Sequence, residues 1–567
     1  MDSAAGIATA RKEDAIMMNR HAFVRNGLAA SALLALVSCS RPETVEVRQE
    51  AESEAEAHVG GIMKFYIGNP VAIDPYNVQE SSGHQVVWAL FDSLVGYDWQ
   101  ARKLVGKAAE TWETNDDSTV HTFYLRPDAT FHNGEAVTAE SFKRAWERIC
   151  DPTMKPRSAI SYHLDPVMGA AQMAVGSATS LSGVEAVDDL TLKVTLVHPM
   201  TDFPYVCAHP ALAPVPQAAL DDPQRFFVAP IGNGPFKMDG EWVPDQSIRV
   251  TRFEDYVDSP AHLDGVHFVF LERPETAFTE FTEGHMDFAP VARGRIGELK
   301  LHYGLSEDGY TATPGQQVLT GTKCSVYYLA VNCEDAVMCD VDVRRAISLA
   351  IDRQRICDNF FDGTYLPADR IVPISVDGDV NGAWEYSRYD MDEAKSLLDK
   401  AYPAADDGKR GLRLSLLFDS GGGHKGILNY VSEDLEKVGI EIELSSFEYE
   451  AFLDAAKSRH CQLVRFGWVA DYPTMDNFLY PLFFSTSADN HSNYAVDAVD
   501  EALLEARGTV DEVDRRLAYR EASKRIGEDM PVIPLMFQSH NHVVSERVAR
   551  LYYDPQGVAH FADAEMV

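Results

Sequence analysis

The chain has 567 residues, of which 46% are hydrophobic and 24% charged, a composition ordinary for a folded protein but a length too great for one compact core. Its 50 basic and 87 acidic residues give a formal net charge of −37 at pH 7. This deficit of positive charge argues against a nucleic-acid-binding protein and against electrostatic attachment to anionic lipid.

The N-terminus has the pattern of an export signal. Arg20, His21 and Arg25 precede an apolar run of small residues, 27–37, which is too short to span a bilayer and has the length of a signal-peptide core. The run ends in the tetrapeptide LVSC, which resembles the lipobox of bacterial lipoproteins. That resemblance implies that Cys39 is acylated and becomes the mature N-terminus. An ordinary signal with a chance cysteine is the alternative.

The segments on either side of Cys39 complete this interpretation. We assign residues 1–38 to the signal peptide, with the translation start open between the first residue and Met17 or Met18. The peptide NRHAFVR resembles a degraded twin-arginine signal, so the export route also stays open. Residues 39–60 are acidic and poor in large apolar side chains, and they predict a flexible tether between a lipid anchor and the folded body.

Seven cysteines remain after Cys39, and none of them forms a C-x-x-C pair, so their spacing predicts no zinc site. Export would permit disulfides, and three of the seven lie close enough in sequence to offer one. The odd number leaves at least one free thiol or an intermolecular bond. The three neighbours are Cys324, Cys333 and Cys339, and the others are Cys150, Cys207, Cys357 and Cys461.

The first half of the folded part of the chain has the pattern of mixed helix and strand. A strand is expected over 62–68 and a helix over 84–95, where apolar residues recur on one side. A strand, loop and second helix follow, with Thr138 as the expected N-cap of that helix. After a further strand at 191–197, the Gly/Pro-rich turn 230–242 runs into an edge strand.

The second half has the pattern of an α/β domain. Residues 325–332 form a continuous apolar run typical of a buried strand, and a helix capped by Asp340 or Asp342 follows. Residues 412–447 give strand, glycine loop, helix and strand, a unit that predicts parallel pairing. The second half is therefore expected to be α/β and the first α+β.

Most of the candidate reactive groups carry no recognisable chemistry. The loop from Gly421 to Gly426 lies where phosphate loops occur but lacks their lysine spacing, and we interpret it as a flexible connection. His540 and His542 would share one face of a strand, where surface residues are expected rather than metal ligands. Nothing assembles a nucleophile, a base and an orienting group, so no catalytic residue, metal ion or cofactor is predicted.

One acid stands out in the stretch RFGWVADYPTMDNF. Asp471 lies at a predicted strand end between Trp468 and Tyr472, where a carboxylate can accept charge-assisted hydrogen bonds from an ammonium group. Arg465, six residues upstream, could hold a carboxylate through its planar fork. Together they suit a zwitterion such as a short peptide. A structural ion pair between Arg465 and Asp471 is the alternative.

Five segments resemble the periplasmic oligopeptide-binding proteins, the solute-binding components of peptide ABC importers, within a resemblance that runs in family order from about residue 62 to residue 555. The segment that contains Asp471 resembles their R-x-G-W-x-A-D-Y motif. The others are FYLRPDATFHNGEAVTAESFKRAWERICDP, IGNGPFKMDGEW, LAVNCEDAVMCDVDVRRAISLAIDR and DMPVIPLMFQSHNHVVS. Asn233 departs from the usual threonine of the second of these, and PLMFQSHN lacks the tyrosine-rich character associated with peptide binders.

The resemblance implies an α/β, two-lobed, periplasmic-binding-protein-like fold (type II, cluster C) that closes on its ligand, with an extra α+β subdomain in the first lobe. The segments expected in each part are 61–85, 205–320 and 530–567 for lobe 1, 86–204 for the subdomain, and 321–529 for lobe 2.

The resemblance also implies roles for single residues. Asp471 would pair with the peptide α-ammonium, Trp468 would form a pocket wall, and Arg465 would meet the carboxylate of short peptides. Tyr162 falls where the first lobe of the family reaches the cleft. The expected ligand-binding set is Asp471, Trp468, Arg465, Gly467, Tyr472 and Tyr162.

The resulting hypothesis is a lipid-anchored, extracytoplasmic, monomeric carrier that delivers short peptides to the permease subunits of an ABC transporter, without chemistry on the peptide. Nucleic acid is not an expected partner, and the membrane is contacted through the lipid anchor alone. A nickel chelate, haem or an oligosaccharide is the alternative solute. A secreted peptidase and a receptor that passes its peptide to a sensor are alternatives from other classes.

Overall fold

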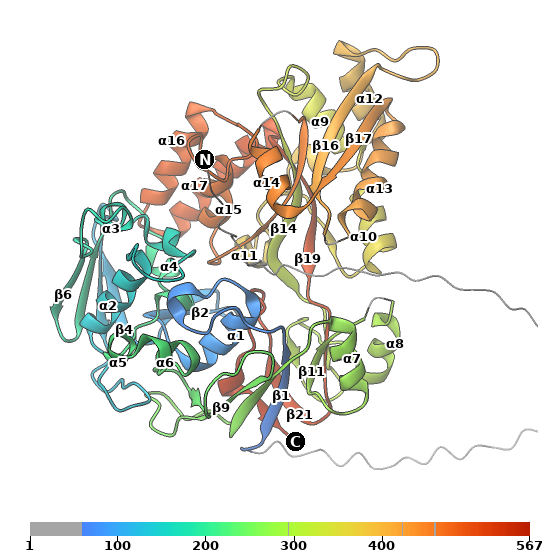
Figure 1. The fold of residues 1–567 in the computed structure, drawn as a ribbon. Coiled ribbons are helices and arrows are strands. Elements are labelled where there is room, and N and C mark those ends of the chain that lie inside the picture. The colour runs from blue at the N-terminus through green and yellow to red at the C-terminus, as the bar shows by residue number, and fades with distance from the viewer. Residues whose placement is uncertain (1–58, 293, 422, 459–460) are drawn as a thin grey trace, which may run out of the picture.

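The computed structural model describes residues 59–567 except 293, 422, 459 and 460, and it divides into two lobes, each built on its own sheet (Figure 1). The expected signal peptide, Cys39 and the tether up to residue 58 lie outside the described residues. In the described part of the chain, no helix combines the length and apolar character that a membrane span requires.

The first lobe is built on a seven-stranded sheet, drawn in the lower part of Figure 1. Its central strand, Ile62–Ile67, alternates buried and partly exposed side chains and pairs in parallel with a strand on each side, as a half-buried strand should. In sheet order the strands are β13 (Val318–Leu319), β20 (His542–Val544), β11 (Phe288–Pro290), β1 (Ile62–Ile67), β10 (Gly265–Phe270), β9 (Ser247–Arg252) and β8 (Phe236–Met238). Its helices are α1 (Ser81–Leu90), α5 (Ala218–Asp221), α6 (Pro223–Val228), α7 (Pro274–Thr282) and α8 (Ile296–Tyr303). A small sheet of β12 (Thr311–Ala312), β21 (Val548–Tyr552) and β22 (Glu565–Met566) completes the lobe.

Helix α1 is shorter than the sequence predicts. Its periodicity extends to residue 95, but the helix ends at Leu90 because the turn before β8 docks against it. The Gly234 amide donates to the Leu90 carbonyl at 2.8 Å, and the Asn233 side chain exchanges hydrogen bonds with the backbone of Asp92. A tertiary contact therefore satisfies the groups that another helical turn would have used.

The extra subdomain lies at the left of Figure 1 as a four-stranded antiparallel sheet covered by α2 (Ala139–Cys150). The predicted cap is confirmed: Thr138 and Ser141 form a capping box. The indole of Trp146 is fully buried and donates to the Leu212 carbonyl at 2.9 Å. The strands are β4 (Ala109–Thr114), β5 (Val120–Leu125), β7 (Thr191–Thr195) and β6 (Val184–Asp188), with the hairpin β2 (Val95–Asp98) and β3 (Lys103–Gly106) and helices α3 (Ala170–Ala174) and α4 (Phe203–Val206) nearby.

The second lobe is built on a six-stranded sheet with the predicted buried strand at its centre. Residues 412–447 form the predicted parallel unit, with Leu412 opposite Ile440 and Asp419 opposite Phe447. In sheet order the strands are β15 (Leu366–Pro367), β19 (Val532–Ser539), β14 (Thr322–Val331), β18 (Leu463–Val469), β16 (Leu412–Asp419) and β17 (Ile440–Phe447). Its helices are α9 (Val341–Ala350), which Asp340 caps, α10 (Arg353–Phe361), α11 (Ile374–Asp377), α12 (Met391–Ala401), α13 (His424–Glu436), α14 (Tyr449–Lys457), α15 (Asp476–Phe483), α16 (Asp497–Gly508) and α17 (Glu512–Asp529).

Two segments cross between the sheets, one from β13 to β14 and one from β19 to β20, and the second departs from the lobe boundaries expected from the sequence. Residues 530–567 were assigned to the first lobe, but β19 pairs with β14 and β15 in the second sheet, where both faces of its nearly continuous buried run are covered. The chain then returns to the first sheet at β20. His540, in this crossing, is fully buried and His542 is partly buried, so the prediction that they are surface residues is wrong.

The seven cysteines of the described residues are all free thiols. Of the pairings that Cys324, Cys333 and Cys339 offered, the one between Cys324 and Cys333 is ruled out by the strand between them. Because β14 is extended, it separates the start of the strand from its end by roughly 20 Å or more, far beyond the span of a disulfide.

Candidate functional site

Asp471 lies directly after β18, at the side of the second lobe that faces the first. Its amide donates to Asn477 Oδ1 at 3.1 Å, and its carbonyl accepts from the Gln556 side chain of the first lobe at 3.1 Å. The indole of Trp468 donates to the same Asn477 oxygen at 3.2 Å. One buried asparagine therefore fixes both the acid and its neighbouring aromatic ring.

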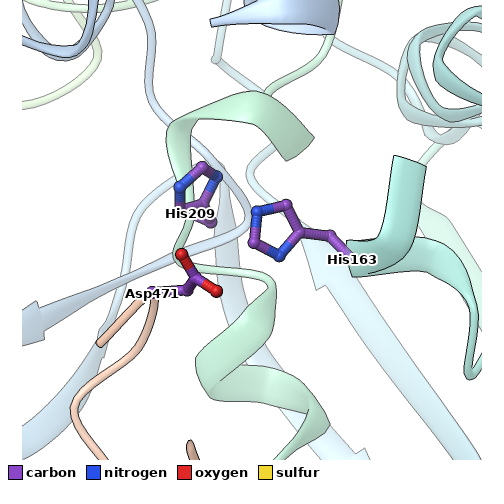
Figure 2. A group of neighbouring side chains, drawn as sticks. All are labelled: His163, His209 and Asp471. Carbon is purple, nitrogen blue, oxygen red and sulfur yellow. The ribbon is translucent and has the colours of Figure 1, made fainter. Parts of the chain in front are cut away.

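The carboxylate of Asp471 is surrounded by residues of the extra subdomain and the segment that follows it. The Tyr162 hydroxyl donates to Oδ1 at 3.4 Å, a long hydrogen bond. The side chains of His163 and His209 point toward the same carboxylate (Figure 2). Among the ion pairs of the described residues, none includes Asp471, so no lysine or arginine neutralises it there.

This environment changes the acidity of the groups around the site. Burial raises the pKa of Asp471 to about 6, and the nearby Asp489 adds to the rise while the Tyr162 hydroxyl opposes it. Burial also lowers the pKa of His163 to about 3 and that of His209 well below its usual value. At neutral pH the site therefore holds a carboxylate beside neutral imidazoles, with no compensating cation from the described part of the chain.

Arg465 is held elsewhere. Its guanidinium donates to Asp419 Oδ1 at 2.9 Å and lies over the ring of Tyr327, with 4.6 Å between the guanidinium carbon and the ring centroid. The alternative of an Arg465–Asp471 ion pair is therefore wrong. Asp419 ends β16, the strand parallel to β18, so the sheet supplies the partner that sequence distance concealed.

The other expected site residues differ in their exposure. Tyr162 is 49% exposed, although its hydroxyl reaches Asp471. Tyr472 is buried in the apolar core of the first lobe, and its hydroxyl donates to Asp476 at 3.0 Å. Gly467 is exposed on β18, and a methyl group added there would meet only ordinary contacts, at 3.6 and 3.8 Å. Steric contacts within the fold thus do not require a glycine at this position.

Strand β18 has an open edge beside the acid. It pairs with β14 along its whole length, but its pairing with β16 is confined to Leu463 and Val464. From Arg465 to Val469 the described residues provide no second strand partner. Backbone donors and acceptors at such an edge can accept an added strand.

A cavity of about 410 Å³ adjoins Asp471 and Tyr472. It extends into the first lobe between the β2–β3 hairpin and the C-terminal segment. Aromatic and polar side chains share its lining, among them Trp88, Tyr97, Trp99, Lys107, His209 and Tyr552.

Sequence reasoning missed several residues that define this site. His163 and His209 are 46 positions apart in the sequence, and only the packing of their two short helical turns brings the rings to a centroid distance of 4.3 Å. Asn477 lies six residues after Asp471, and its role depends on the side chain folding back toward the end of β18. Only Tyr162, next to His163, gave a signal in this part of the sequence.

Comparison with known proteins gives consistent matches. The family model "Bacterial extracellular solute-binding proteins, family 5 Middle" matches residues 103–490. The chain is 29% identical to the probable deoxycholate-binding periplasmic protein YgiS of Escherichia coli, over 83% of this chain and 86% of that protein. It is 26% identical to the periplasmic oligopeptide-binding protein OppA of Salmonella typhimurium, over 91% and 94%.

Among solved structures, the periplasmic murein tripeptide-binding protein MppA in its unliganded open form matches with a TM-score of 0.77, at 24% identity, over 90% of this chain and 97% of that one. This likeness confirms the predicted fold: mixed α/β, two-lobed and periplasmic-binding-protein-like.

Proposed function

Because this chain belongs to the bacterial extracellular solute-binding proteins of family 5, we propose that it captures short peptides by their free amino terminus and delivers them to an ABC permease. Proteins of this family bind solutes for transport and are not enzymes, which removes the peptidase alternative. Several relatives are named as oligopeptide- or dipeptide-binding proteins, and this supports peptides as the solute class.

The observation that carries the proposal is the unpaired carboxylate of Asp471. A partly buried anion without a cation is unfavourable, and its raised pKa expresses that cost. The α-ammonium of a peptide would supply both the missing charge and three hydrogen-bond donors. Asp489 adds negative charge nearby, which favours a cationic group at this position.

The open edge of β18 supports a main-chain mode of binding. A peptide extended along residues 465–469 would pair with this edge as an added strand, with its amino terminus toward Asp471. The exposed Gly467 would let the peptide backbone approach closely. This mode gives affinity through the backbone and leaves side-chain preference weak. In this proposal Trp468 and Tyr472 flank the amino terminus, and Arg465 would reach a peptide carboxylate only by leaving Asp419.

Closure of the lobes on a ligand would follow from the positions of Asp471 and Tyr162. Asp471 comes from the second lobe, whereas Tyr162 comes from the first, so a ligand that contacts both binds the closed form more tightly than the open one. A ligand shifts this equilibrium only by such a difference in affinity. The closed form would then be the one that the permease recognises.

A bile-acid ligand is the alternative that one relative suggests, since YgiS is named as probably deoxycholate-binding. The aromatic cavity beside Asp471 would suit an apolar ring system. Deoxycholate is itself a carboxylate, however, and Asp471 with Asp489 would repel it. Peptides with a free amine therefore fit the site better.

The attachment of the protein to the cell is also part of the proposal. Family membership indicates an extracellular location. We infer that acylated Cys39 anchors the chain and that residues 39–60 tether the folded body. We further expect a monomer, because one chain supplies both walls of the site.

Isothermal titration calorimetry with a tripeptide and its N-acetylated form tests the proposal. The free peptide should bind, and the acetylated form should bind at least about tenfold more weakly, the equivalent of 1.4 kcal/mol. Mass spectrometry afterwards should return both peptides intact. Equal affinity for the two forms would contradict capture by the amino terminus, and cleaved peptide would contradict a carrier.

A further inference from the structure

We propose that His163, His209 and Asp471 form a binding site for a divalent transition metal of the Zn²⁺ type. Each of the three side chains offers a ligand atom, and these atoms all lie within 4.8 Å of one another. Two imidazoles and one carboxylate are a donor set that Zn²⁺ accepts, with a fourth position left open.

The three ligands come from separate parts of the fold (Figure 2). His163 lies in the short 3-10 helix Ser161–Leu164, and His209 directly precedes another, Pro210–Leu212. Asp471 follows β18 in the second lobe. No sequence spacing could reveal such a site, which is why a metal was not predicted. A bound ion would also join the two lobes.

An unsatisfied polar atom provides a second, independent observation. His163 is 4% exposed, and its Nε2 has no hydrogen-bond partner among the described residues. A buried polar atom without a partner destabilises a fold, and such groups in native structures often mark an absent ion or water. A metal at this point would satisfy the lone pair.

The site requires some adjustment before it can bind. Ligand atoms around tetrahedral zinc lie roughly 3.4 Å apart, given bonds of about 2.0–2.2 Å, so the three groups must move closer. The Ala211 amide also donates a weak hydrogen bond to His209 Nδ1 at 3.3 Å. Coordination of the metal through His209 Nε2 would place the ring proton on Nδ1, and this hydrogen bond would be lost. These changes predict an affinity weaker than that of a preformed structural zinc site.

The ion would have a route into the site. His209 and Asp471 both line the cavity of about 410 Å³, so a metal could enter from it and water could complete the coordination. A metal on Asp471 would occupy the carboxylate that an α-ammonium needs. Metal and free-amine peptide should therefore compete.

The contrasting interpretation is packing. His84, His163 and His209 form a run of ring contacts, with centroids 5.2 and 4.3 Å apart, and such a cluster can serve the core alone. The two interpretations differ in a measurable way, since a packing cluster binds no ion.

The test titrates Zn²⁺ into the chelator-treated, metal-free full-length protein and follows the heat. We expect one ion per chain for the wild type, and a loss of at least about tenfold in affinity for His163→Gln and for His209→Gln. The matched control is His285→Gln, in the exposed group with Glu280 and Glu283, which should leave the high-affinity event unchanged. Circular dichroism checks that each variant is folded.

Replacement of Zn²⁺ by Co²⁺ gives a readout that does not depend on the variants. The visible absorption of Co²⁺ should show imidazole coordination in the wild type and should fall when a free-amine peptide is added. No binding by the wild type, or binding that only His285→Gln removes, would overturn the metal site. Because peptide affinity is measured separately in a chelator, failure of the metal site leaves the peptide proposal standing, and the reverse also holds.

Discussion

Asp471 and Gly467 are two residues whose local environment the fold alone does not explain. The carboxylate is partly buried beside neutral histidines and lacks a cation in the described part of the chain, and the glycine occupies a strand position where a methyl group would fit. The buried carboxylate is unfavourable for stability, and the glycine is unnecessary for it. Each becomes reasonable if a ligand with an amine and an extended backbone lies against β18.

Gly467→Ala separates binding from stability. Glycine in a strand interior is less favourable than alanine, so the melting temperature should stay the same or rise slightly. The added methyl should obstruct a peptide backbone and weaken binding by about 1–3 kcal/mol, the usual cost of overpacking. Thermal unfolding and calorimetry measure the two effects. Unchanged affinity would place the peptide away from this strand.

At this scale the sequence identified some residues of the candidate site and missed others for a physical reason. The motif around Asp471 is local, so an acid at a strand end between Trp468 and Tyr472 could be predicted. The alternative ion pair between Arg465 and Asp471 was wrong, because Asp419, 46 residues away on a neighbouring strand, holds the guanidinium. The position of His163 beside Asp471 also depends on long-range packing, which a single sequence does not reveal.

At the scale of elements, periodicity located helices and strands well but not always their ends. The strand at 325–332 and the parallel unit at 412–447 were predicted because burial on both faces, or a helix between strands, leaves a strong pattern. Helix α1 ended earlier than its pattern because Gly234 binds its last residue and Asn233 binds Asp92 just beyond it. A helix end that is set by a distant turn has no local signal.

Gly232→Ala tests how closely that turn is packed against α1. An added Cβ would lie 1.8 Å from the Leu90 carbonyl oxygen, so either the turn or the helix must move. We expect a loss of about 1–3 kcal/mol in the free energy of unfolding, measured by urea denaturation.

The matched control is Gly297→Ala in α8, where nothing lies within 4 Å of the added Cβ. Alanine at this exposed position should stabilise the helix by about 0.5–1 kcal/mol. If both variants unfolded at the same urea concentration, the turn would not be the contact that ends α1.

At the scale of the whole molecule, two sheets joined by two crossing segments form the framework. Contacts between the lobes are not confined to the site: Arg515 of the second lobe pairs with the buried Asp202 beside the extra subdomain at 2.9 Å. The two-lobed fold could be predicted from the order of matching segments. The crossing at β19 could not, since strand pairing rather than chain position decides the lobe.

The lipid anchor is a prediction at this scale as well. Cys39→Ser should release the protein from the membrane fraction, because the thiol that carries the acyl chains is lost and no other anchor is proposed. Detergent phase partitioning and the intact mass of the mature chain measure this. Membrane retention of the variant, without acyl mass on the wild type, would contradict a lipoprotein.

Asp471→Asn, studied by calorimetry with a free-amine peptide and its N-acetylated form, tests the central claim most directly. Asparagine keeps the shape of the side chain but removes its charge, so binding of the free amine should weaken by about 2–5 kcal/mol, as expected when one partner of a buried pair is removed. The acetylated peptide should be almost unaffected, and so should both peptides in Asp116→Asn, an exposed turn residue of the extra subdomain. Unchanged affinity of the free peptide, or an equal loss for both peptides, would contradict the account that this carboxylate holds the amino terminus.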